Sequence, residues 1–96
     1  MYEILFSSAS ERYFKKLKDK SLKDAYETAL LRLQTNPYIG QPKRGDLAGT
    51  YGFDISHKGV NYEIAYTFNE HYGKKIIVLL AGTRENFYEE LKRYIK

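Results

Sequence analysis

The first part of the chain holds apolar residues first at strand-like and then at helix-like spacing. Residues 2–6 (YEILF) alternate and are β-prone, which predicts a first strand. Ser7 or Ser8 can cap the helix that follows, and ASERYFKKLKD places its apolar residues at helical spacing among lysines. Ser21 is a second cap candidate, before the apolar stripe of LKDAYETALLRLQTN. Because few residues separate the two helices, we expect an antiparallel helical hairpin that ends before Pro37.

In the second half of the chain the apolar period changes to two. Residues 37–49 contain both prolines of the chain and several glycines, so we predict a loop there. From residue 51 to residue 68, apolar side chains alternate with small or polar ones through a turn at SHKG. This alternation predicts two paired strands, in which Asp54 and Glu63 lie on the face opposite the apolar one.

The end of the chain has the pattern of an inner strand followed by a helix. Residues 75–82 (KIIVLLAG) are almost entirely apolar and predict a strand covered on both faces. Thr83 can cap a final helix, in which apolar residues recur at every fourth position. We therefore predict one α+β domain, residues 1–96: an N-terminal strand and helical hairpin packed on a mostly antiparallel curved sheet, with a short C-terminal helix.

Composition narrows the environment and the partners. No apolar run approaches the roughly 20 residues that cross a bilayer, and the N-terminal residues lack the pattern of a secretion signal, so we expect a cytoplasmic protein that contacts no membrane. Cysteine is absent, which leaves His57 and His71 as the soft ligands and predicts neither a metal nor another cofactor. The formal net charge of +4 favours an anionic partner, either nucleic acid or an acidic protein.

Arg84 stands where a positive side chain is unfavourable unless an anion is present. It follows Gly82 and Thr83 at the predicted start of a helix, where unpaired backbone N–H groups already favour negative charge. A bound phosphate would suit this position, because glycine lets it approach the backbone and the guanidinium can donate two hydrogen bonds. The alternative is an exposed arginine paired with Glu85 or another surface acid.

The whole chain resembles the RelE/ParE superfamily of small bacterial toxins. The resemblance is carried by the order of its elements and by the segments GDLAGTYGFDISHKGVNYEIAY and LLAGTRENFYEELKRYI. The first is similar to the family's Leu-x-Gly turn, aromatic-led strand, hairpin and strand ending in aliphatic-x-Tyr, and the second to its strand, Gly-x-Arg and terminal helix. The resemblance implies a toxin of a type II toxin–antitoxin system with an acidic antitoxin that wraps it. DNA would then be reached only indirectly, through the toxin–antitoxin complex.

In the RNA-cleaving branch, the resemblance implies a toxin that enters the ribosome and cleaves mRNA by driving a ribose 2′-hydroxyl onto the adjacent phosphate. Arg84 matches the arginine that stabilises the phosphate, and Tyr88 resembles a tyrosine used at the same end of the site. Lys43 and Arg44 match a basic loop before the second strand, and Lys58 lies in the following hairpin turn. We expect these three cations to bind RNA.

The chain departs from the RNA-cleaving pattern on the predicted open face. Gly52 and Asp54 stand where those toxins often carry lysine or arginine, and Glu63 replaces a common arginine. If Asp54 and Glu63 share this face with Arg84, one carboxylate could act as general base while the arginine holds the phosphate. Alternatively, the carboxylates repel RNA and only hold Arg84 in ion pairs.

Three functions are therefore open. The first is a ribosome-dependent mRNA endoribonuclease, which the retained Arg84 favours. The second is a non-enzymatic poison of DNA gyrase of the ParE type, which would use the same fold. The third is an inactive relative that retains only antitoxin binding. Transfer of a phosphoryl group through a 2′-hydroxyl needs no metal, so we expect none for the first function.

Overall fold

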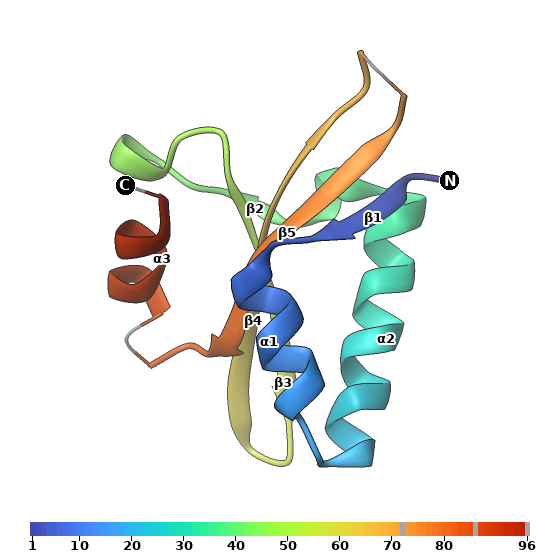
Figure 1. Cartoon of the computed structure of the whole chain (residues 1–96), viewed down its shortest axis with the longest axis vertical. Coiled ribbons are helices and arrows are strands. Elements are labelled where there is room, and N and C mark those ends of the chain that lie inside the picture. Colours follow the sequence, from blue (N-terminus) through green and yellow to red (C-terminus); the bar gives the residue numbers. More distant parts are fainter. Residues whose placement is uncertain (72, 86, 96) are drawn as a thin grey trace.

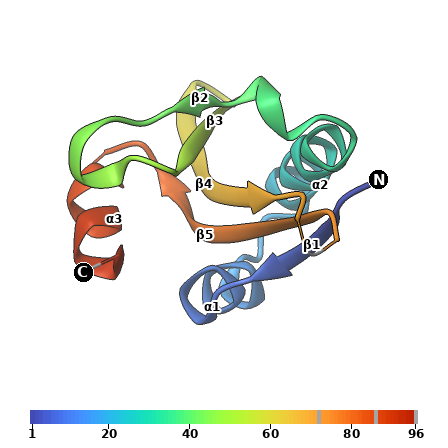
Figure 2. The same cartoon turned by 90° about the horizontal axis from the view of Figure 1, so that it is seen from above.

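The computed structural model describes residues 1–71, 73–85 and 87–95 and contains a five-stranded sheet with the strand order β1-β5-β4-β3-β2. In that order the strands are β1 (Glu3–Phe6), β5 (Lys75–Thr83), β4 (Val60–Asn69), β3 (Tyr51–His57) and β2 (Gln41–Pro42). The first strand is parallel to β5, and every other neighbouring pair is antiparallel. Figures 1 and 2 show the twisted sheet between α2 on one side and α3 on the other. The predicted α+β fold with a mostly antiparallel sheet is confirmed.

The helical hairpin consists of α1 (Ser8–Lys16) and α2 (Lys20–Thr35). Ser7 caps α1, because its hydroxyl accepts a hydrogen bond from the Ser10 amide at 3.1 Å. The prediction of Ser21 as the second cap is wrong, since the Asp19 carboxylate accepts hydrogen bonds from the amides of Ser21 and Leu22. An aspartate in this position satisfies two orphan N–H groups and adds negative charge at the positive end of the helix.

The hairpin packs on one face of the sheet and α3 (Phe87–Ile95) packs on the other. Successive residues of β4 show this division, because Ile64 and Tyr66 belong to the core beneath α2 while Ala65 belongs to a second cluster with Phe87 and Leu91 of α3. The alternation predicted for residues 51–68 is therefore confirmed. No helix within the described part of the chain is both long and apolar enough to span a bilayer.

Residues 37–49, predicted as a loop, contain short regular elements anchored to the sheet. They form η1 (Pro37–Ile39), β2 and η2 (Gly45–Leu47). The buried Tyr66 hydroxyl donates to the Pro37 carbonyl at 2.6 Å and accepts from the Gly40 amide at 3.1 Å. These bonds fix the start of the segment against β4. The residues that follow run across the sheet toward α3.

Two residues at strand ends differ from the sequence-based expectation. Thr83 is the last residue of β5, paired with Tyr62, and not a helix cap, because it still belongs to the strand and α3 begins only at Phe87. The residue immediately before α3 lies outside the described residues. His57 is the last residue of β3, and the turn itself consists of Lys58 and Gly59, both with positive φ.

Candidate phosphate-binding site

Strand register gathers charged side chains on the face of the sheet near α3. Asp54 of β3 pairs directly with Glu63 of β4, and Glu63 pairs with Gly82 of β5 on its other side. Arg84 follows Gly82 by two residues, and its amide donates to the Asn61 carbonyl at 3.0 Å, which holds the chain beside β4. Asp54, Glu63 and Arg84 therefore share one face, as strand alternation predicts.

Glu63 is the buried centre of this cluster. Its side chain is 2% exposed, and its Oε2 lies 2.7 Å from Nζ of Lys43, which is itself only 7% exposed. The other oxygen, Oε1, lies 3.6 Å from Nε of Arg84. A carboxylate engaged by two cations in this way satisfies the requirement that a buried charge be paired.

Gly52 provides the space for this pair. A Cβ at this position would overlap the Glu63 carboxylate and would lie 2.9 Å from the Lys43 ammonium. A glycine inside a strand commonly marks such a close approach. The pairing of Lys43 with Glu63 was not predicted, and Gly52 was the one signal in the sequence that could have indicated it.

The ammonium group of Lys43 is held as a cation. Burial on its own lowers the pKa of Lys43, but the hydrogen bond and charge of Glu63, together with Tyr88, outweigh burial and raise the pKa above its usual value. The ring of Tyr88 covers the ammonium at 4.1 Å from the ring centroid, a distance at which a cation is attracted to an aromatic face. Lys43, expected to contact RNA directly, is thus enclosed between Glu63 and Tyr88.

Arg84 and Asp54 form the exposed part of the cluster. Nη1 of Arg84 lies 3.4 Å from Oδ2 of Asp54, and the two side chains are 46% and 57% exposed. The guanidinium therefore contacts two carboxylates, as the ion-pair alternative requires, yet keeps an open side on which further N–H donors are available. The formal charges of Lys43 and Arg84 are cancelled by those of Asp54 and Glu63.

The remaining candidate site residues lie in two separate parts of the structure. Tyr88 and Arg44 lie beside the cluster, on a groove between η2 and α3 that Lys92 also lines. Lys58 is not brought together with them: it occupies the turn between β3 and β4, near the start of α2 (Figure 1). There it helps to lower the pKa of Asp19, after the larger contributions of the hydrogen bonds from Ser21 and Leu22.

The two histidines lie away from the cluster. Nε2 of His57 is 3.0 Å from the Ser21 hydroxyl, a partner that the sequence did not indicate, and His71 forms an isolated bridge with Gly73. Within residues 1–71, 73–85 and 87–95, no three His, Cys, Asp or Glu side chains are grouped so that they could hold a metal ion. The expectation of a metal-free reaction remains a prediction.

Comparison with known proteins places the fold in a family. Residues 4–92 match the model of a family described as ParE-like toxins of type II bacterial toxin–antitoxin systems, and the chain therefore belongs to that family. The protein is a toxin of a type II toxin–antitoxin system, and the predicted membership of the RelE/ParE superfamily is confirmed.

Among solved structures, a chain of the RelBE2 toxin–antitoxin complex from Mycobacterium tuberculosis is similar, with a TM-score of 0.66 and 26% sequence identity. The match covers 86% of this chain and 98% of that one. No curated protein sequence matches the chain.

Proposed function

We propose that this toxin is a ribosome-dependent endoribonuclease that cleaves mRNA by attack of a ribose 2′-hydroxyl on the adjacent phosphate. The observation that carries the proposal is the position of Arg84: a half-exposed guanidinium beside the exposed carboxylate of Asp54. A cation that can stabilise a phosphorane-like transition state and a base that can accept the 2′ proton are the groups this reaction needs.

Asp54 is the better candidate for the general base. Both oxygens of Glu63 are engaged by cations inside the protein, whereas the Asp54 carboxylate has an open side. Phosphate bound to Arg84 would bring the neighbouring ribose beside Asp54. Glu63 then acts as a positioning residue, because it holds both Arg84 and Lys43.

The reaction is balanced by a proton donor at the other end of the site. Asp54 accepts the 2′ proton, the 2′ oxygen forms a bond to phosphorus, and the bond from phosphorus to the 5′ oxygen breaks. The products are a 2′,3′-cyclic phosphate and a 5′-hydroxyl, and the group we assign to supply the proton to the leaving oxygen is the hydroxyl of the half-exposed Tyr88. Its pairing with Lys43 keeps the ring at the edge of the cluster.

We also propose a cognate antitoxin of acidic character as the partner that silences this toxin. The similar chain belongs to a toxin–antitoxin complex, and the net charge of +4 favours association with a negatively charged segment. Such a segment would compete with RNA for the same cations.

A second candidate function is poisoning of DNA gyrase without catalysis. It is favoured by the cancellation of charge in the cluster, since two carboxylates on the open face weaken attraction for an RNA backbone. The family description also names ParE-like toxins. In this case the target would be a protein–DNA complex, and DNA breaks would accumulate while mRNA stays intact.

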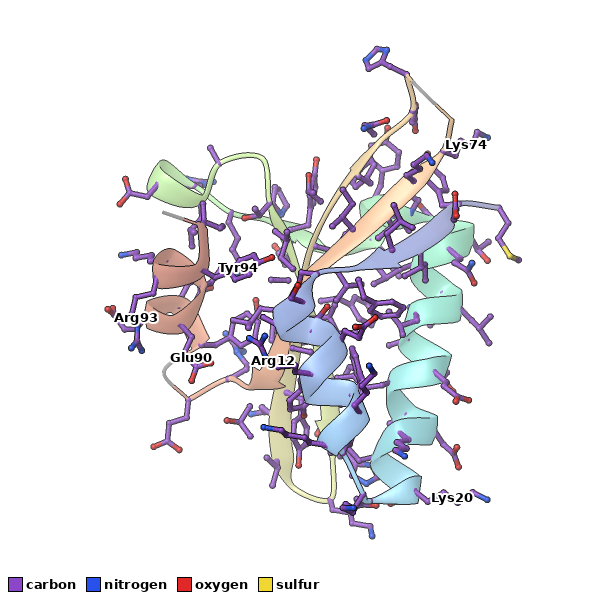
Figure 3. The ribbon with its side chains drawn as sticks, in the orientation of Figure 1. Arg12, Lys20, Lys74, Glu90, Arg93 and Tyr94 are labelled. Carbon is purple, nitrogen blue, oxygen red and sulfur yellow. The ribbon has the colours of Figure 1, made fainter. Side chains whose placement is uncertain are left out.

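Induction of the toxin in a bacterial host, with mapping of mRNA 5′ ends and of plasmid topology, tests the proposal. Arg84→Ala should reduce codon-phased mRNA cuts by about a hundredfold or more, and Asp54→Asn by a similar factor. Arg12→Ala on α1 (Figure 3) and Asp24→Asn on α2 are matched controls that should cleave like the wild type. Broken DNA with intact mRNA would refute the nuclease in favour of the gyrase poison, and neither form of damage would refute both.

A further inference from the structure

The strand β1 forms one edge of the sheet (Figure 2), and within the described chain it pairs with β5 alone. The amides of Glu3 and Ser7 donate to carbonyls on the β5 side at 2.9 Å and 3.0 Å. Because successive residues of a strand turn their backbone groups to opposite sides, the N–H and C=O groups of Ile4 and Phe6 point away from β5. These groups form an open row on which another strand can pair.

The side chains along this open row are apolar. Leu5 is 39% exposed, Phe6 is 43% exposed, and Ile4 is half-buried. Proteins usually protect an edge strand with a charge, a proline or a bulge, and residues 4–6 contain none of these. Glu3, the charged residue of β1, stands at the start of the strand and lies 3.4 Å from Lys75.

Another uncovered stretch of the sheet shows the protection that β1 lacks. The short β2 pairs with β3 at Tyr51 and Gly52, so the later residues of β3 also have an open edge. Asp54 places a charge there, and its side chain is 57% exposed. The contrast indicates that the edge of β3 is kept free and that the edge of β1 is paired with another chain.

An apolar cavity of about 350 Å³ lies beside the open edge. It is lined by Phe6 together with Phe14 of α1 and Tyr26 and Leu30 of α2. The rings of Phe6 and Phe14 are in edge-to-face contact, with their centroids 5.7 Å apart. A strand that pairs with β1 therefore lies against a larger apolar surface than the edge alone provides.

The charges around this cavity favour a second copy of the chain over an acidic partner. The lining contains two acids, Glu11 and Glu27, and two bases, Lys15 and Lys23, so its formal charge is zero. An acidic antitoxin segment gains no net attraction from such a set. A second copy brings the same balanced set, and the two copies meet here without the repulsion that their net charges of +4 cause elsewhere.

We propose that β1 pairs antiparallel with β1 of a second copy of this chain, across a two-fold axis at Leu5. In this register Ile4 of each copy faces Phe6 of the other, and the outward N–H and C=O groups of both residues are satisfied. Leu5 faces its own counterpart, and Glu3 faces Ser7, so no like charges meet. The contact uses the same surface on both copies, which closes the assembly at a dimer.

The dimer leaves the Arg84 cluster open in both copies. β1 pairs with residues 75–78 at the start of β5, whereas Arg84 follows the last residue of that strand. Dimerisation is therefore compatible with either target proposed above and depends on neither.

Sedimentation velocity of the purified full chain over a range of micromolar concentrations tests the dimer. Leu5→Lys and Leu5→Glu should each raise the dimer dissociation constant by at least about tenfold, because two like charges then meet at the axis. An equal mixture of these two variants should form dimers again, since residue 5 faces residue 5. Leu31→Lys is the matched control: Leu31 is 58% exposed on α2, and its substitution should leave the dissociation constant unchanged. Far-UV circular dichroism checks that each variant is folded.

A cross-linking experiment tests the register. The chain contains no cysteine, so Leu5→Cys introduces a single thiol at the axis, where the two Cβ atoms of directly opposed residues are close enough for a disulfide. Mild oxidation should link this variant into dimers, whereas Val60→Cys, which is 42% exposed on β4, should stay unlinked. A wild-type chain that sediments as a monomer throughout would overturn the proposal and leave this edge to a different protein. A dimer that Leu5→Lys does not weaken, or a mixture of the two charged variants that stays monomeric, would overturn it as well.

Discussion

Substitution of Glu63 by glutamine separates a structural role of this residue from a catalytic one. Glu63→Gln keeps the shape of the side chain but removes the negative charge that faces Lys43 at 2.7 Å. The lysine is 7% exposed and lies beneath the Tyr88 ring, so water cannot replace the lost partner without opening the site.

The expected loss of stability follows from burial. Removing one partner of a buried ion pair typically costs about 3–5 kcal/mol, because the other charge remains without compensation. The glutamine oxygen can still accept a hydrogen bond from the ammonium, so we expect the low end, about 3 kcal/mol. For a domain of this size that loss lowers Tm by roughly 12–24 °C. Glu3→Gln breaks an exposed pair with Lys75 at 3.4 Å and should cost less than about 1 kcal/mol.

The loss should also depend on pH with a defined sign. In the wild type the pKa of Lys43 is raised above 10.5, so the contribution of the pair is complete below pH 10.5 and is lost as pH rises through the folded-state pKa. In Glu63→Gln, burial remains and lowers the pKa of Lys43, so the unfolded chain binds more protons than the native one and stability rises with pH. The difference in free energy of unfolding between Glu63→Gln and the wild type should therefore become smaller toward pH 10.

Urea unfolding at several pH values measures the loss, and a double-mutant cycle with Lys43→Met assigns it to the pair. The double variant should recover much of the stability that Glu63→Gln loses, because it removes the uncompensated charge. The reasoning is refuted if Glu63→Gln costs less than about 1 kcal/mol or if the two substitutions are additive. Abolished mRNA cleavage in a variant of unchanged stability would instead make Glu63 a catalytic residue.

Gly52→Ala should cost about 1–3 kcal/mol, because its Cβ would overlap the Glu63 carboxylate, whereas Gly82→Ala, across β4 with nothing within 4 Å of the new Cβ, should cost less than about 1 kcal/mol. Urea midpoints check both, and equal losses would contradict the argument from space. In the same assay Tyr66→Phe should cost about 1–3 kcal/mol, because it leaves two buried backbone groups without their partner; a loss under about 0.5 kcal/mol would speak against this. Burial raises the pKa of Tyr66 to about 12, and a hydrogen bond to a carboxylate raises the pKa of Tyr2 to about 12. The contribution of each tyrosine to the free energy of unfolding is thus complete below pH 10 and is lost toward pH 12. For Tyr66 the free energy of unfolding should fall by about 1.4 kcal/mol per pH unit in this range. A urea midpoint that stays constant between pH 9.5 and 11.5 would contradict this.

The spacing of apolar and polar residues predicted the helices and strands that residues close in the sequence determine. The alternation after residue 51 predicted both long strands and their faces, since a strand buried on one side requires it. The second helix cap was assigned to Ser21 and not to Asp19, because both residue types cap helices and only the path of the chain between α1 and α2 decides between them. The parallel pairing of β1 with β5 joins residues about seventy positions apart and has no local signature.

The candidate site likewise contains residues whose positions local sequence predicted and residues whose positions it could not predict. Asp54, Glu63 and Arg84 were predicted to share a face because each lies at a fixed position relative to a strand, and the structure brings their side chains within ion-pair distance. Lys43 lies in a segment without periodicity, so its burial against Glu63 could not be predicted from spacing. The sequence gives no sign of a role for Lys92, because a basic residue near the end of a helix is ordinarily a favourable surface charge.

Gly52 and Glu63, which both depart from the pattern of the RNA-cleaving toxins, belong to one arrangement of side chains. Without a side chain at Gly52 there is room for the Glu63 carboxylate, and that carboxylate in turn gives the Lys43 ammonium a place beside the strands. A cation is thus present near the open face, supplied by the segment before β3 and not by β3 itself, but its charge is already balanced. Of the cluster cations that the structure describes, Arg84 is the one with substantial exposure, so RNA cleavage at this site depends on whether phosphate binds the open side of its guanidinium while Asp54 stays beside it. A wild-type level of mRNA cuts in Arg84→Ala would therefore place the chemistry elsewhere on the molecule.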